Sequence, residues 1–192
     1  IFYPILLIFL IITQNRYLNI ETITWDISSY LVASNEIKHG FIPFETQWES
    51  KGPLTVYIYY FLSLLSGNNY VIFKLLNDVI LFLTILIFIG IAKNYNSKDS
   101  QQNFAALLLT SVFSIQWFVS EYTEFYCLPL IGIANYLYLR NSEKNKKYIG
   151  LVFGISFLIN QGSVLFFIPI IFDYFLKNYS DIKNVITSVI KY

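Results

Sequence analysis

Methionine is absent from the 192-residue sequence, and cysteine and histidine occur once each. Because a disulfide needs two cysteines, the single Cys127 excludes a disulfide framework or a cysteine-based metal site within the chain. His39, the only histidine, likewise excludes a zinc site that needs two or three histidines. Cys127 lies in an apolar run, where its expected role is that of a small buried hydrophobic side chain.

Charge is scarce as well, and this decides the broad class of protein. Charged residues make up 13% of the chain and hydrophobic residues 56%, with a net charge of +1. The sequence contains no basic patch with interleaved aromatic residues, so nothing in it indicates a nucleic-acid partner. A soluble core of this size could not bury so much apolar surface, so the composition predicts an all-α, polytopic transmembrane helical bundle.

The apolar residues fall into runs that predict six spans. A seventh run, Leu54–Leu65, would extend only about 18 Å as a helix, against a hydrocarbon core of about 30 Å, so we expect it to lie on or dip into the membrane. The chain begins with Ile1 and stops within a helical pattern, and we therefore expect an incomplete transmembrane domain. The spans are predicted at about residues 1–13, 70–92, 104–119, 125–139, 148–159 and 163–176, the last two joined by a tight hairpin at 160–162.

The first loop, about residues 14–69, is the one long polar interval. Its segment Trp25–Pro53, with Glu21 just upstream, holds five of the twelve acidic residues. Spanning helices can be joined by a few residues, so a loop of this length, rich in Trp, Pro, Gly and charge, indicates chemistry at the membrane surface.

Charge also predicts the topology. If Leu54–Leu65 does not cross the membrane, three later connections fall on the same side of it, which the positive-inside rule makes cytoplasmic. These connections are Lys93–Ser100, Arg140–Lys147 and Lys177–Tyr192. The three tryptophans then fall at the outer interface, as an aromatic belt requires. The cytoplasmic set has nine basic residues and three acids: Lys93, Lys98, Arg140, Lys144, Lys146, Lys147, Lys177, Lys183, Lys191, Asp99, Glu143 and Asp181. The outer set has three basic residues and seven acids: Arg16, Lys38, Lys51, Glu21, Asp26, Glu36, Glu45, Glu49, Glu121 and Glu124.

This topology brings the long loop and the SEYTE turn to the same surface, where three charged residues are candidates for a site. Asp26 opens a predicted interfacial helix, where helix capping is the alternative role. Lys51, beside Gly52 and Pro53, can reach a phosphate at the headgroup level, or can be an ordinary interface lysine. Glu124, like Glu121 before it, can contribute a carboxylate or simply be solvated. We expect Asp26, Lys51 and Glu124 to converge.

Two charges inside a span have a simpler explanation. Lys74 and Asp78 are four residues apart in the first turns of the predicted span 70–92. An internal ion pair therefore accounts for both without a functional site. Asp173, near the inner end of its helix, is also expected to be structural.

The order of these residues resembles a known family. Asp26, Tyr30, Gly40 and Pro43 are followed by Lys51-Gly52-Pro53 before a hydrophobic segment, and by Thr123-Glu124 after two spans. This is similar to the amino-terminal half of the GT-C glycosyltransferases, within the group of the protein O-mannosyltransferases, the lipid A aminoarabinose transferases and the RgtA/B/C/D-like enzymes.

The resemblance implies a multi-pass enzyme of the cytoplasmic membrane that transfers a sugar, with inversion, from a polyprenyl-phosphate carrier to a glycan, lipid or protein acceptor outside. It implies catalytic roles for Asp26 and Glu124 and donor-phosphate binding by Lys51. Two departures stand out: Ile27 replaces the acid that often follows the first Asp, and Gln161 occupies the place of a second phosphate-binding lysine. We assign substrate contacts to Tyr30, Glu49 and Glu121.

Several alternatives stay open. The residue types fit transfer from a sugar phosphate, because a lysine or a metal can stabilise the leaving phosphate and a carboxylate can align or deprotonate the acceptor hydroxyl. A divalent metal could be held by Asp26, Glu49 and Glu124, although no spacing demands one, and no other cofactor is expected. A transporter of lipid-linked glycans or a non-catalytic membrane subunit would also contain these residues. A transporter would be expected to show internal repeats, and we find none.

Overall fold

The computed structural model describes residues 2–15, 25–43, 45, 51–95, 97–115, 121–140 and 143–177. All regular secondary structure in these ranges is helical, which confirms the all-α prediction for this part of the chain. The elements are α1 (Phe2–Asn15), α2 (Trp25–Lys38), α3 (Pro53–Leu65), α4 (Tyr70–Asn94), α5 (Asp99–Phe113), α6 (Thr123–Leu139), α7 (Glu143–Ile159), the 3₁₀ turn η1 (Gln161–Ser163) and α8 (Val164–Lys177).

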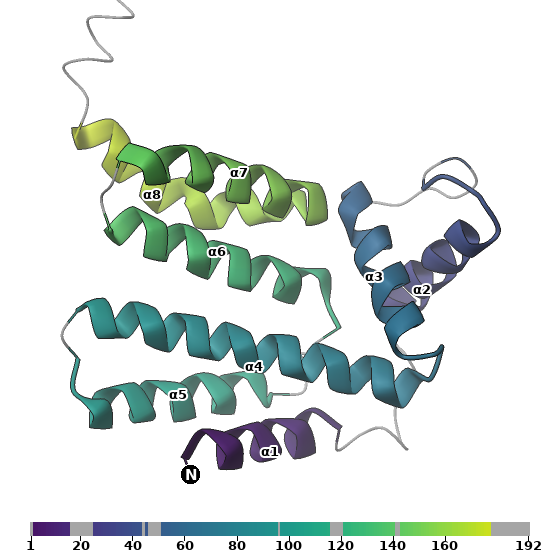
Figure 1. The fold of residues 1–192 in the computed structure, drawn as a ribbon, viewed down its shortest axis with the longest axis horizontal. Helices are drawn as coiled ribbons and strands as arrows, with labels where there is room; N and C mark the ends of the chain where they lie inside the picture. Colours follow the sequence, from purple (N-terminus) through teal and green to yellow (C-terminus); the bar gives the residue numbers. More distant parts are fainter. Residues whose placement is uncertain are drawn as a thin grey trace, which may run out of the picture.

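Helix α4 is the central element. It packs against α1 and α5 on one side and against α6 on the other, and α6 in turn packs against α7 and α8 (Figure 1). Its 25 residues extend about 37 Å, enough to cross a hydrocarbon core of about 30 Å. Among the described helices it alone is both long and apolar enough to cross a membrane.

The bundle has two different ends. The carboxyl ends of α4, α6 and α8 and the amino ends of α5 and α7 lie together on the left of Figure 1, and α2 and α3 lie at the opposite end. The α4–α5 and α6–α7 connections and the end of α8, which the charge distribution predicts to be cytoplasmic, lie at the left-hand end in Figure 1. Helices α2 and α3 of the first long loop lie at the other end, and the side of the membrane stays a prediction.

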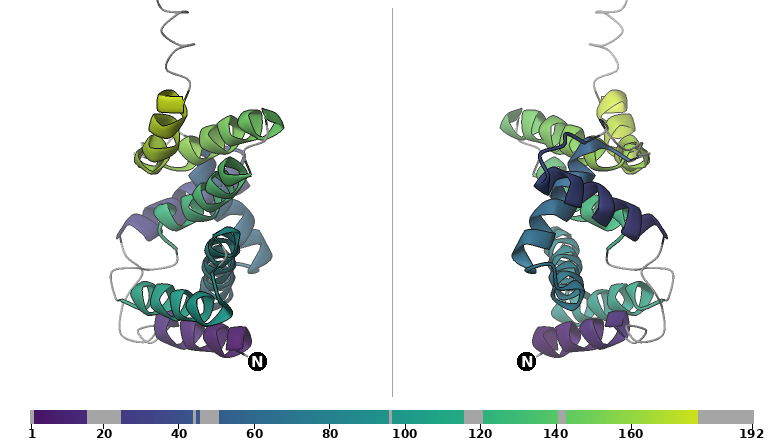
Figure 2. Two further views of the ribbon diagram at one scale, coloured as in Figure 1. Left: turned by 90° about the vertical axis from the view of Figure 1, so that its left-hand side faces the viewer. Right: turned by 90° about the vertical axis from the view of Figure 1, so that its right-hand side faces the viewer.

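Helices α2 and α3 lie across the bundle rather than along it. Figures 1 and 2 both show α3 upright, whereas α4 runs across Figure 1 and is seen end-on in Figure 2. Helix α3 packs against α2, α4 and α7. A helix of this orientation at the end of a bundle fits the prediction that Leu54–Leu65 does not run parallel to the spans.

Two hydrophobic clusters hold the bundle together. The first, around Tyr59 and Phe73, joins α2 and α3 to the near ends of α4, α6 and α7. The second, around Leu10 and Ile85, joins α1 and α5 to the rest of α4. Because both include residues of α4 and α6, these two helices couple the crossing helices to the remainder of the bundle.

The start of α3 approaches α7 very closely, and this requires glycine at position 52. The Gly52 N–H donates a hydrogen bond to the Ile159 carbonyl at 3.1 Å, and the Thr55 hydroxyl donates to the same oxygen at 2.6 Å. A Cβ atom added at Gly52 would lie 1.9 Å from the Leu158 carbonyl oxygen. Backbone rather than a flexible side chain fills that space, so any side chain must separate the two helices.

We expect Gly52→Ala to lower the stability of the protein because the new methyl group collides with the α7 backbone. The expected loss is about 2–4 kcal/mol, in the range of other severe packing defects. Gly150→Ala, in the same α7, is the matched control because nothing lies within 4 Å of its added Cβ. Thermal unfolding of both variants in detergent measures the effect, and equal melting temperatures would contradict this account of Gly52.

Candidate functional site

The site is built where the beginnings of α3 and α6 meet the end of α7. The Lys51 ammonium lies 3.2 Å from Glu124 Oε1, although the two residues are far apart in the sequence. Lys51 directly precedes Gly52, whose contact with Ile159 fixes this point of the chain. Glu124 lies in the first turn of α6, where the helix dipole favours a carboxylate. Of Asp26, Lys51 and Glu124, which the sequence predicts to converge, the last two are therefore in direct contact.

Asn160 completes this arrangement. Its side-chain N–H₂ donates to Glu124 Oε1 at 2.8 Å and to the Thr123 hydroxyl at 3.0 Å, and the Thr123 hydroxyl in turn donates to Glu124 Oε2 at 3.2 Å. Its own side-chain oxygen accepts the Gly162 N–H at 2.9 Å, which shapes the turn between α7 and α8. Both carboxylate oxygens of Glu124 are thus held by neutral donors, independently of Lys51.

The ion pair is accessible to a ligand. The Glu124 side chain is 56% exposed and that of Lys51 is 26% exposed. Ion pairs of such exposure typically contribute less than about 1 kcal/mol to stability, so folding does not explain why the two charges are placed together. A lysine with three N–H donors beside an aligned carboxylate can bind an anion while the carboxylate accepts a hydrogen bond or a proton.

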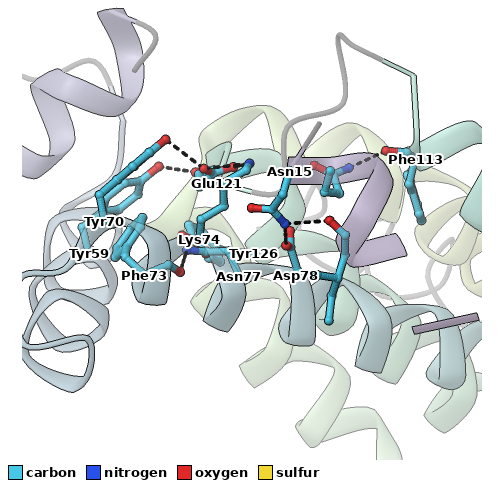
Figure 3. Close-up of polar contacts among 12 residues, drawn as sticks. Asn15, Tyr59, Tyr70, Phe73, Lys74, Asn77, Asp78, Phe113, Glu121 and Tyr126 are labelled. Atoms are coloured by element: carbon cyan, nitrogen blue, oxygen red, sulfur yellow. Dashed lines mark hydrogen bonds and ion pairs between the residues drawn. The ribbon is translucent and has the colours of Figure 1, made fainter. Parts of the chain in front are cut away.

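A buried ion pair lies close in the chain to this surface site, and Figure 3 shows its contacts. The Lys74 ammonium lies 3.0 Å from both Oε1 and Oε2 of Glu121, with side-chain exposures of 7% and 0%. The Tyr70 hydroxyl donates to Glu121 Oε1 at 3.1 Å, and the Tyr59 hydroxyl donates to the Glu121 backbone carbonyl. Burial, with smaller contributions from neighbouring Tyr126 and Glu121, raises the pKa of Tyr59 well above its ordinary value, so this hydroxyl keeps its proton.

This cluster pins the segment that enters α6. Tyr59 belongs to α3 and Tyr70 and Lys74 to α4, and all three hold Glu121, three residues before Glu124. The predicted substrate contact of Glu121 is therefore revised, because a fully buried, ion-paired carboxylate positions its neighbours instead of meeting a ligand.

The predicted Lys74–Asp78 pair is also revised. Among the described residues, the ion pair of Lys74 is with Glu121, which is more distant in the sequence. The Asp78 carboxylate accepts a hydrogen bond from the Asn15 side chain at 2.5 Å and so connects α4 to α1. The helical spacing that suggested a local pair is correct, but Lys74 is directed to the turn before α6 and Asp78 to α1.

The other predicted site residues have different surroundings. Asp26 is exposed in the first turn of α2, inside the helix and not at its cap position, and within the described residues it contacts neither Lys51 nor Glu124. Tyr30 is 3% exposed and packs its ring 5.2 Å from that of Tyr59, which favours a core role over substrate contact. Gln161 is exposed in η1, and Glu49 lies outside the described residues.

Sequence reasoning missed the supporting residues. Asn160 stood out only as a break between two apolar runs, and Lys74 was explained by its helical neighbour. A lysine in an apolar helix together with an acid in a turn between two spans was the available signal for the buried pair. No comparable signal linked Asn160 to Glu124.

A metal site is not formed by the described part of the chain. Within it, no group of three or more His, Cys, Asp or Glu side chains is arranged to hold an ion. The proposed ligand set included Glu49, which lies outside the described ranges. The binding of a divalent metal by Asp26, Glu49 and Glu124 therefore stays an open alternative.

Most of the chain matches a known protein family. The sequence matches the dolichyl-phosphate-mannose-protein mannosyltransferase family over residues 50–192, a range that includes Lys51, Glu124 and Asn160. The fold and site define a helical protein with a paired cation and carboxylate at one end. The chain belongs to the dolichyl-phosphate-mannose-protein mannosyltransferase family.

Membership implies a membrane glycosyltransferase that uses a polyprenyl-phosphate-linked sugar. No curated protein and no solved structure matches the sequence. Asp26 and Tyr30 precede the matched region, so their roles depend on the sequence argument alone.

We expect Lys74→Met to destabilise the protein by about 3–5 kcal/mol, because it leaves the Glu121 carboxylate buried without its partner. The double variant Lys74→Met/Glu121→Gln should recover much of this loss, since it removes the uncompensated charge. Lys93→Met, at the exposed far end of α4, is the control and should change stability by less than about 0.5 kcal/mol. Denaturant titration in detergent tests this; additive effects in the double variant would contradict the pairing.

Proposed function

We propose that this protein transfers a sugar from a polyprenyl-phosphate carrier to a glycan, lipid or protein acceptor on the non-cytoplasmic side of the cytoplasmic membrane. The observation that carries the proposal is the accessible Lys51–Glu124 pair, 3.2 Å apart, within the region matched to the family. Such a pair offers a cation to the donor phosphate and a fixed carboxylate beside it.

Lys51 binds the donor phosphate. Breakage of the bond between the anomeric carbon and the phosphate oxygen leaves negative charge on the phosphate, and an ammonium placed there stabilises that charge as it develops. Because Asn160 and Thr123 also hold Glu124, Lys51 can turn a donor toward the phosphate without releasing the carboxylate. Gln161, exposed in η1 directly after Asn160, supplies a second, neutral donor to the same phosphate.

The carboxylates act on the acceptor. Asp26, exposed on α2, accepts the proton of the acceptor hydroxyl as its oxygen attacks the anomeric carbon from the side opposite the phosphate, which inverts the configuration. Glu124 aligns Lys51 and the sugar. Glu49 contacts the substrate from the same loop. Tyr30 supports α2 from the core, and Glu121 supports Glu124.

The membrane arrangement is part of the proposal. We infer that α1, α4, α5, α6, α7 and α8 cross the membrane, as the spans of a multi-pass protein. Helices α1, α5 and α8 expose large apolar side chains that lipid would cover, for example Ile12, Phe104 and Leu165, which are 63%, 66% and 64% exposed. Trp25, 87% exposed at the start of α2, fits the headgroup level of the outer leaflet.

We expect Lys51→Met and Glu124→Gln each to reduce sugar transfer by the full-length protein at least about 100-fold, because each removes a charge that acts on the reacting groups. Stability should change by less than about 1 kcal/mol, as for other exposed pairs. Initial rates with a polyprenyl-phosphate-linked sugar, together with melting temperatures, measure both effects. A large fall in melting temperature in both variants, or unchanged initial rates, would contradict a role of the pair in sugar transfer.

Asp26→Asn should abolish transfer while leaving membrane insertion and donor binding intact, because an amide accepts no proton at neutral pH. Asp99→Asn is the matched control, since Asp99 is also exposed in the first turn of a helix but lies at the opposite end of the bundle. Single-turnover rates with bound donor compare them. Equal rates for the two variants would remove Asp26 from the mechanism.

The orientation can be tested with two single-cysteine variants in a Cys127→Ser background. Lys38→Cys, at the end of α2, should react with a membrane-impermeant thiol reagent added outside intact cells, whereas Lys93→Cys, at the other end of the bundle, should react only after the membrane is made permeable. Both residues are exposed, so access to the reagent depends on the side alone. The reverse pattern would place the site on the cytoplasmic side.

A further inference from the structure

A second cavity opens at the same end of the bundle as Lys51 and Glu124. It is an open pocket of about 600 Å³ between the second half of α2, the end of α3 and the start of α4. This volume is typical of sites for small ligands. None of the residues that carry the Lys51 site lines it, so it is a separate site.

The chemistry of its walls is unusual for an apolar bundle. Leu31, Val32 and Phe73 are apolar, and most of the surface of the cavity is apolar, while the other lining residues carry hydroxyl, amide or basic groups. No acidic residue lines the cavity. The polar lining residues are Ser34, Asn35, Lys38, His39, Ser63, Ser66, Asn68, Asn69 and Tyr70.

The positive charge is held in place by the turn between α3 and α4. Gly67 and Asn68 both have positive φ, 60° and 63°, and this conformation turns the chain sharply after α3. The Lys38 ammonium donates to the Asn68 side-chain oxygen, which uses one of its three N–H groups. Asn69 accepts the Val71 N–H at 2.9 Å and so caps α4. The Asn69 side chain is therefore held by the backbone of α4, and that of Asn68 by Lys38.

One residue connects this cavity to the proposed catalytic site. Tyr70 lines the cavity, and its hydroxyl donates to Glu121, the buried residue that positions Glu124. Tyr70 therefore links the wall of the cavity to the buried cluster that precedes Glu124 in the chain.

We propose that this cavity binds an anionic sugar unit of the acceptor. Fixed amides and hydroxyls match the hydroxyl groups of a sugar ring, the apolar wall matches its C–H face, and Lys38 with His39 matches a carboxylate or phosphate substituent. That the sugar belongs to the acceptor rests on the proposed transferase function. That the cavity binds an anionic sugar does not depend on it.

The test is direct binding to the full-length protein in detergent, with glucuronic acid and glucose as probes, because the two share ring hydroxyls and differ in the carboxylate. We expect saturable binding of glucuronic acid at least about tenfold tighter than that of glucose, as a charge-assisted hydrogen bond provides. Lys38→Met should remove this preference. Lys93→Met, at the far end of α4, should keep it.

The outcomes separate the two proposals. No saturable binding of glucuronic acid, or an unchanged preference in Lys38→Met, overturns the anionic-sugar site. Because binding is measured without donor, Glu124→Gln should retain it even though transfer is lost. If the unmodified protein binds glucuronic acid but shows no sugar transfer, the anionic-sugar site is supported and only the proposed function is refuted.

Discussion

The buried pair of Lys74 and Glu121 is the interaction on which this end of the molecule depends. A charge removed from water is tolerated only when its partners are close and well aligned, and here an ammonium and two tyrosine hydroxyls surround the Glu121 residue. Because these partners come from α3 and α4, the pair fixes the crossing helix and the central helix to the start of α6.

The exposed Lys51–Glu124 pair has the opposite character. Its charges are solvated, so their attraction contributes little to folding, and their placement depends on the surrounding backbone. Gly52 permits the contact between α3 and α7, and Asn160, at the end of α7, holds Glu124. The buried pair thus fixes the segment before α6, and the exposed pair lies at the surface of the first turn of that helix.

Helices that cross the end of the bundle create room for ligands. If α3 ran parallel to α4, its polar turn could not lie beside α2, and the cavity between them would not form. The same turn, with its two positive-φ residues, fixes Lys38 through Asn68. The loop that the sequence marks as unusual therefore contributes both Lys51, which we propose binds the donor phosphate, and walls of a separate cavity.

Hydrophobic runs and short motifs are local properties, and they were enough to predict the helical class and the family. The sequence also predicted that Asp26, Lys51 and Glu124 converge, and the structure joins Lys51 and Glu124 in a direct contact that does not include Asp26. It could not determine the partner of Lys74, since the helical neighbour Asp78 and the distant Glu121 are chemically equivalent choices. It could not place Asn160 beside Glu124 or bury Tyr30 and Glu121 either. Those outcomes depend on how helices far apart in the chain pack, and only the tertiary structure decides which groups lose their water.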